Sequence, residues 1–228
     1  MTSMLLAAFV VGVQSGPVDI RVRPTPRLVL TYEMGVKMSA QGGTVDARIF
    51  LEDRFLKQVG KTLFWQTDTK NVVLETTGGF KTAEETLKYG FDMDALWERD
   101  DRHRTIAISI GEYRMLSGSN EGTSDVVLPD RPVRLGDRWP GRFTVGGKNV
   151  RVSYVYRGPH RVNGTPTYLI EALFDEVDIE QTKPYRFHVA QDDGRTVLAS
   201  GGAKFNTNGM TVEAKFSMRR TAKYTAPE

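Results

Sequence analysis

The sequence predicts a mainly β protein: a curved antiparallel meander that forms a half-barrel or incomplete barrel, with one or two short helices. Apolar and polar residues alternate with a period of two along most of the chain, as in strands that bury one face. Three Asn-Gly or Asp-Gly pairs separate such runs and supply the positive φ angles that tight hairpins need. We therefore expect most strands to pair with their neighbours in sequence.

The first half of the chain predicts four strands in succession. A long alternating run covers residues 28–38, and Gly42-Gly43 turns it into a second run over 45–55. Shorter β-like runs follow at 63–66 and 71–75. These runs form the start of the meander.

Helix signals occur only in the next segment. Thr82-Ala83-Glu84-Glu85 reads as a capping box and predicts a short helix that ends before Gly90. A second short helix is expected over 93–99. Strand alternation then returns at 105–110.

The second half carries the clearest hairpin pattern. Alternating runs cover 150–156, 168–174, 185–189, 196–205 and 210–218. The turns between them contain Asn163-Gly164, Asp193-Gly194 and Asn208-Gly209.

Between the halves lies a polar, Gly/Ser-rich loop, 117–124, followed by a segment that we name the clip, residues 128–139. Its prolines favour an extended backbone, Leu128, Val133 and Leu135 can seat in apolar grooves, and Gly136-Asp137 predicts a tight turn. Trp139 would bury a large ring at the end of the sheet. A structural clip is expected from Leu128, Pro129, Pro132, Gly136, Asp137 and Trp139; the alternative is that Asp137 and Trp139 rim a sugar or lipid site.

An open, flat sheet of about ten strands would leave its apolar face wet, so the sheet must curl over itself or over the short helices. Tyr, Phe and Met are abundant at the strand positions that face inward. The space that the curved sheet encloses is therefore either a cavity or a core packed with these side chains. If it is a cavity, the candidate ligand contacts are Tyr32, Met34, Tyr154, Phe187 and Phe216.

The clip pattern Leu-Pro-x-x-Pro-Val-x-x-Gly-Asp-x-Trp resembles that of exported bacterial proteins of unknown function, whose curved sheets are similar to the half-barrels of periplasmic lipoprotein carriers. The motif covers twelve residues, and the strand order over 27–220 is compatible with the resemblance. The resemblance implies a fold and a compartment, and it brings no catalytic residues.

The chain is expected to be exported to the periplasm or secreted. Residues 4–13 form an uncharged apolar run, and Val13-Gln14-Ser15 fits cleavage after Ser15, although the usual preceding positive charges are missing and a buried first strand is the alternative. With no cysteine, neither disulfides nor a lipid anchor are expected. No apolar run is long enough for a transmembrane span. We expect a signal peptide over 1–15, a lead-in over 16–26 and a single β-rich domain over 27–228, whose halves are joined by the loop and clip at 117–140.

No nucleic-acid partner is expected, because 31 Lys and Arg residues balance 28 Asp and Glu residues without forming a basic block. The histidines His103, His160 and His188 are far apart in the sequence and form no HExxH or HxH motif, so no metal site is predicted. The acidic run 175–180 reads as a solvated strand face, with a loose calcium site or a pair of hydrolase carboxylates as the alternative. No catalytic residue and no cofactor are predicted.

Three classes of function remain. The first is a non-catalytic binding or carrier module of the cell envelope, with a lipid or another apolar small molecule as ligand. The second is a structural component with a filled core and an envelope protein as partner. The third is an unrecognised hydrolase, which would need converging carboxylates in a cleft.

Overall fold

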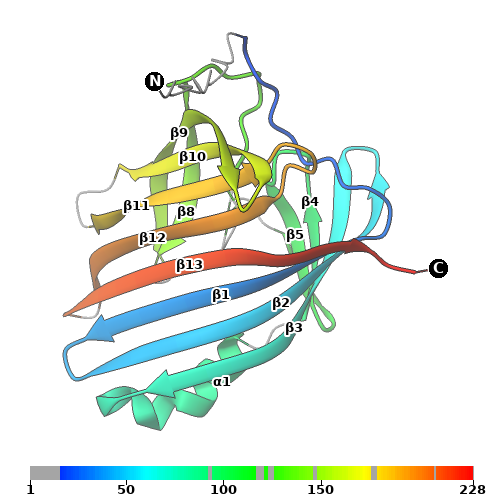
Figure 1. Ribbon diagram of the computed structural model, residues 1–228. Coiled ribbons are helices and arrows are strands. Elements are labelled where there is room, and N and C mark those ends of the chain that lie inside the picture. Colours follow the sequence, from blue (N-terminus) through cyan, green and yellow to red (C-terminus); the bar gives the residue numbers. More distant parts are fainter. Residues whose placement is uncertain are drawn as a thin grey trace, which may run out of the picture.

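The computed structural model describes residues 16–91, 94–116, 121–122, 126–145, 148–175, 179–207 and 209–227. They form one sheet, in the order β6-β5-β4-β3-β2-β1-β13-β12-β11-β10-β9-β8-β7 (Figure 1). The strands are β1 Leu28–Ala40, β2 Gly43–Val59, β3 Thr62–Thr76, β4 Ala95–Arg99, β5 Thr105–Ile110, β6 Tyr113–Leu116, β7 Glu121–Gly122, β8 Arg138–Val145, β9 Lys148–Val162, β10 Thr165–Phe174, β11 Ile179–Ala190, β12 Thr196–Thr207 and β13 Met210–Thr225.

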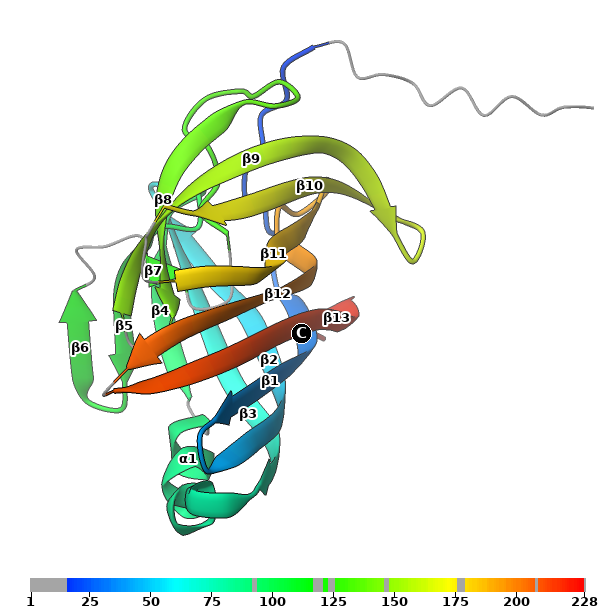
Figure 2. The same cartoon turned by 90° about the vertical axis from the view of Figure 1, so that its left-hand side faces the viewer.

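The predicted curved meander is confirmed. Twelve strands pair antiparallel, and the two-residue β7 adds to β8 in parallel. The N-terminal and C-terminal groups of strands join where β1 pairs with β13, in a register that runs from Leu28 opposite Thr225 to Ala40 opposite Val212. The sheet bends strongly around an inner face and does not close, since β6 and β7 end its two edges (Figure 2).

The hairpin turns follow the glycine signals. Asn163 and Gly164 have φ angles of 48° and 83°, which closes β9 onto β10 in the two-residue turn that the sequence predicts. Gly194, at φ 70°, has a second role, because a Cβ there would stand 1.9 Å from the carbonyl oxygen of Arg21. That turn therefore needs glycine both for its backbone angle and for the close approach of the lead-in.

Helix is limited to the segment between β3 and β4, where a 3₁₀ turn, Gly78–Ala83, leads into α1, Glu84–Phe91. The Thr82 hydroxyl donates to the carbonyl of Gly79 instead of capping α1. The Thr76 hydroxyl, on the inner face of β3, donates to Glu84 at 2.7 Å and ties α1 to that face. The second helix expected over 93–99 is wrong: Ala95–Arg99 is strand β4, whose alternate side chains Ala95, Trp97 and Arg99 are buried.

Candidate ligand-binding face

The inner face of the sheet has two zones. In the packed zone, nearest the clip, side chains are fully enclosed by other parts of the chain: Tyr154 and Phe187 are 0% exposed, and Tyr32 is 3% exposed. Trp139 stacks on Tyr154 with ring centroids 5.8 Å apart, and Phe187 meets Tyr154 edge-on. This zone is a core in the ordinary sense.

The clip fills part of this zone. Leu128 and Pro129 are buried, and the Trp139 Nε1 donates to the carbonyl of Val127 at 2.7 Å. The Asp137 carboxylate accepts the backbone N–H of Arg134 at 2.9 Å across the turn at Gly136, whose φ is 87°. Pro132, another of the predicted clip residues, is exposed.

One expectation about the clip is wrong. Leu135 does not seat in an apolar groove, because it is 70% exposed. It follows Arg134 in the turn, where the chain leaves the core.

The lead-in adds an extended segment beside the clip. Val18 and Val133 exchange two backbone hydrogen bonds of 2.8 Å, and Ile20 and Val22 join the core. Residues 16–26 are therefore part of the packed domain.

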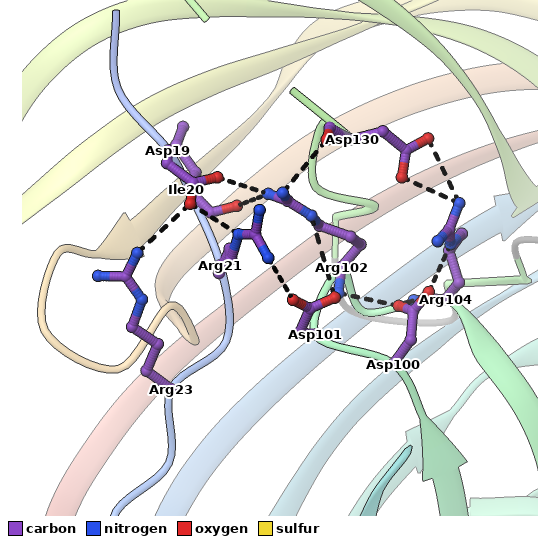
Figure 3. Close-up of polar contacts among 9 residues, drawn as sticks. All are labelled: Asp19, Ile20, Arg21, Arg23, Asp100, Asp101, Arg102, Arg104 and Asp130. Atoms are coloured by element: carbon purple, nitrogen blue, oxygen red, sulfur yellow. Dashed lines mark hydrogen bonds and ion pairs between the residues drawn. The ribbon is translucent and has the colours of Figure 1, made fainter. Parts of the chain in front are cut away.

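A polar cluster holds the lead-in, the β4–β5 turn and the clip together (Figure 3). The buried Arg102 donates to the Ile20 carbonyl at 2.6 Å and lies 3.1 Å from Asp19. Its other Nη donates to the Asp130 carbonyl at 3.3 Å. Arg104 bridges Asp100 and Asp130 at 2.6 and 3.0 Å. A 220 Å³ hollow adjoins these side chains, whose charges are matched by one another, so the cluster serves to join segments.

A second ionic network is buried under β2, β12 and β13. Arg220 donates to both oxygens of Asp193, at 2.9 and 3.1 Å, and Arg195 pairs with Asp53. Burial opposes ionisation of Asp193, but the charge and hydrogen bonds of Arg220, with smaller contributions from Arg195 and Lys223, hold the pKa of its carboxyl below the usual range. Arg195 also lies over the Trp65 ring, 4.4 Å from its centroid.

The second zone of the inner face is less covered. Met34, Val36 and Met38 follow one another on this face of β1 and are all only half-buried. Phe216 of β13 pairs with Val36, and it too is half-buried. We name these four side chains the apolar wall. The cross-strand neighbours of the wall, Val45, Ala47, Ile49 and Met218, are buried.

The structure thus separates the five predicted ligand contacts. Tyr32, Tyr154 and Phe187 lie in the packed zone, whereas Met34 and Phe216 belong to the apolar wall. Strand parity placed all five on the inner face, but it does not say which parts of that face other segments cover.

The outer face is polar beside the wall. A hollow of about 560 Å³ lies over β1, β2 and β13, with Gly35 in its floor. Ion pairs between Glu33 and Arg219 and between Lys37 and Asp46 flank it. Its mixed charges do not suit an apolar ligand.

The acidic and histidine residues considered from the sequence are only partly placed. Glu176 and Asp178 lie outside the described residues, Glu180 is exposed, and Asp192 pairs with Lys223 at 2.6 Å. His103 is buried in the β4–β5 turn, while His160 and His188 come together over β10. In the described part of the chain no group of three or more His, Cys, Asp or Glu side chains is placed to hold a metal ion. None of the described helices could span a membrane.

The buried ionic network was missed, although the sequence carries a signal for it. Asp53 shares strand parity with Leu51 and Phe55, and Arg220 shares it with Met218. A charged residue on an otherwise apolar strand face predicts a buried partner. Nothing in the sequence identifies that partner, which here comes from a turn.

The sequence matches no protein family and no curated protein. Among solved structures, a lipovitellin described for its lipid–protein interactions is similar with a TM-score of 0.45 and 9% identity, over 90% of this chain and 26% of that one. This chain therefore spans about a quarter of the length of lipovitellin.

Two bacterial structures are similar at lower scores. A putative outer membrane lipoprotein-sorting protein domain from Vibrio parahaemolyticus has a TM-score of 0.29 and 11% identity, over 88% of this chain and 86% of that one. A DUF1329 family protein from Desulfovibrio piger has a TM-score of 0.23 and 11% identity, over 87% of both chains. All three are distant similarities of fold.

Proposed function

We propose that the protein is a non-catalytic binding or carrier module of the cell envelope, exported to the periplasm or secreted, and that it holds one apolar or amphipathic molecule against the apolar wall. The observation that supports this is the contrast between the two zones of the inner face. Tyr154 and Phe187 near the clip are completely enclosed, yet Met34, Val36, Met38 and Phe216 stay half-buried. A curved sheet that only filled its own interior would have no need to leave such side chains partly exposed.

The chemistry of the wall favours an acyl chain over a polar ligand. Two thioethers, a branched aliphatic and an aromatic ring offer no hydrogen bond of note, and methionine adapts its shape to flexible chains. Each buried methylene of a ligand contributes about 0.8 kcal/mol, so a long chain can bind here without any specific polar contact.

The test uses neighbouring residues on opposite faces of β1. Met38 is half-buried on the inner face, and Ser39 is exposed on the outer face. Delipidated protein is titrated with fluorescently labelled palmitic acid. Met38→Lys should weaken binding by about tenfold or more, because each tenfold change corresponds to about 1.4 kcal/mol and the charge removes that much apolar contact. Ser39→Lys, the matched control, should bind as the parent does.

Native mass spectrometry of the purified protein provides a second readout, since a co-purifying lipid adds its mass to the protein. Absence of any saturable uptake by the parent would overturn the proposal, as would equal binding by both lysine variants. The second candidate, a structural component whose core is filled by its own side chains, predicts no saturable uptake.

A further inference from the structure

Two histidines that are separated in the sequence meet on the outer face of the sheet. His160 of β9 pairs with Thr167 of β10, and His188 of β11 pairs with Leu169 of the same strand. Their imidazole rings reach towards one another over β10, with centroids 4.8 Å apart and planes inclined at 57°.

That separation is compatible with two imidazoles that share a metal ion. With Zn–N distances of about 2.0–2.1 Å and an N–Zn–N angle between a right angle and the tetrahedral angle, the ring centroids of two ligating histidines lie about 4.5–5.2 Å apart. The rings of His160 and His188 fall within this range without any movement of the backbone.

Polar atoms of the surrounding residues are also available. Thr167, the residue of β10 opposite His160, is 0% exposed, and its Oγ1 has no hydrogen-bond partner among the described residues. The buried Nδ1 of His188 likewise has no partner in the described part of the chain. His160 is exposed, so an ion could reach the pair from solvent.

The charge of a neighbouring cationic side chain is partly offset. Arg186 lies two residues before His188 and pairs at 3.0 Å with Glu171, its cross-strand partner on β10, and Glu171 also pairs with Arg157 at 2.6 Å. One carboxylate thus faces two guanidinium groups, so the positive charge of Arg186 is reduced and not cancelled.

From this geometry we propose that His160 and His188 form a binding site for a borderline divalent transition-metal ion such as Zn²⁺, Ni²⁺ or Cu²⁺. Imidazole nitrogen suits these ions, whereas Mg²⁺ and Ca²⁺ prefer oxygen ligands. Two protein nitrogens leave the other coordination positions open to water or to a further ligand. The site lies on the outer face, so it is independent of the apolar wall.

Calorimetric titration of tag-free protein with ZnCl₂, NiCl₂ and CuCl₂ tests the site. We expect saturable binding of one ion and none of Mg²⁺. His160→Ala should reduce the affinity by about tenfold or more, since even loss of an outer contact to a metal ligand costs 10–100-fold. His188→Gln should have the same effect, and circular dichroism confirms that each variant is folded.

Arg161→Ala is the matched control, because Arg161 is exposed beside His160 on β9 and its side chain bonds only the Gly164 carbonyl at 2.8 Å among the contacts described. It should retain the affinity. A double variant, His160→Ala with His188→Gln, keeps His103, so binding by it at parental affinity would assign the ion elsewhere and overturn the proposal. Failure of the parent to bind any of the three ions overturns it equally. Neither result would bear on lipid binding.

Discussion

The indole of Trp139 donates a 2.7 Å hydrogen bond to the carbonyl of Val127, which ties the last residue of the clip to the residue that precedes its first. The same indole stacks on Tyr154, which is fully buried. Trp139 thus joins the start of β8 to the segment that fills the packed zone, and it does so through both its polar and its apolar surface.

Substitutions that remove the hydrogen bond of Trp139 alone, or the hydrogen bond together with the ring stacking, should reduce stability by different amounts. Trp139→Phe keeps most of the ring but leaves the Val127 carbonyl without this donor, so we expect a loss of about 1 kcal/mol in the free energy of unfolding. Trp139→Ala also removes the stacking, and because the side chain is only half-buried we expect a loss of about 2–3 kcal/mol, below the range for a fully buried tryptophan. Urea denaturation measures both. No loss in Trp139→Phe would contradict a role for the hydrogen bond, and equal costs of the two variants would contradict a role for the stacking.

The close contact between Gly194 and the lead-in can also be tested. Gly194→Ala should destabilise the protein well beyond the cost of its backbone angle, because the new Cβ would meet the Arg21 carbonyl. Gly164→Ala is the control, since φ there is also positive, at 83°, and nothing lies within 4 Å of the added carbon. We expect about 1–3 kcal/mol for the control from backbone strain alone. Limited proteolysis should cut residues 16–26 faster only in the Gly194 variant.

Acid should weaken the fold through Asp193. Its carboxyl pKa is lower in the folded protein than the ordinary 3.8, so the stability from this ion pair is present above about pH 4 and is lost as pH falls through the folded pKa. Asp193→Asn leaves Arg220 buried without its counter-charge and should cost about 3–5 kcal/mol at neutral pH. It should also flatten the acid dependence of stability.

Asp192→Asn is its matched control. Asp192 shares Lys223 with Asp193 but its side chain is 64% exposed, so its loss should cost at most about 1 kcal/mol. Chemical denaturation at pH 7 and well below pH 4 compares the variants, and similar costs at the two positions would contradict the buried network.

Alkali should act through Tyr185 and Tyr156. Burial raises the pKa of Tyr185 to about 12 and, with a smaller effect from Tyr168, that of Tyr156 also to about 12. Their neutral forms therefore stabilise the fold fully below pH 10, and this stability is lost as pH rises through 12. In a spectrophotometric pH titration, Tyr185→Phe should remove one of the phenol ionisations near pH 12. Unchanged amplitude there would contradict its burial.

Much of this fold follows from local pattern. Alternation predicts the starts of β1, β9, β10 and β13 to within three residues, because strand period and turn glycines are set by neighbours in sequence, although β9 and β13 extend further than the predicted runs. Segment 95–99 was misread because its buried Arg99 and Trp97 depend on packing with β3 and β5, and such tertiary contacts override local propensity.

The sites were harder to predict for the same reason. Parity assigned Met34 and Tyr154 to one face, yet only the position of the clip decides that Tyr154 is enclosed and Met34 is not. The expectation of no metal site rested on the separation of His160 and His188 along the chain. Antiparallel pairing through β10 brings their rings to 4.8 Å, so that premise does not hold.

The pairing of β1 with β13 also has a kinetic consequence. β1 pairs with a strand almost two hundred residues later in the chain, so the centre of the sheet cannot assemble until β13 has been made. Such high contact order slows folding and leaves strand edges unpaired in the meantime. A chaperone that shields these edges until β13 is made would therefore favour correct folding.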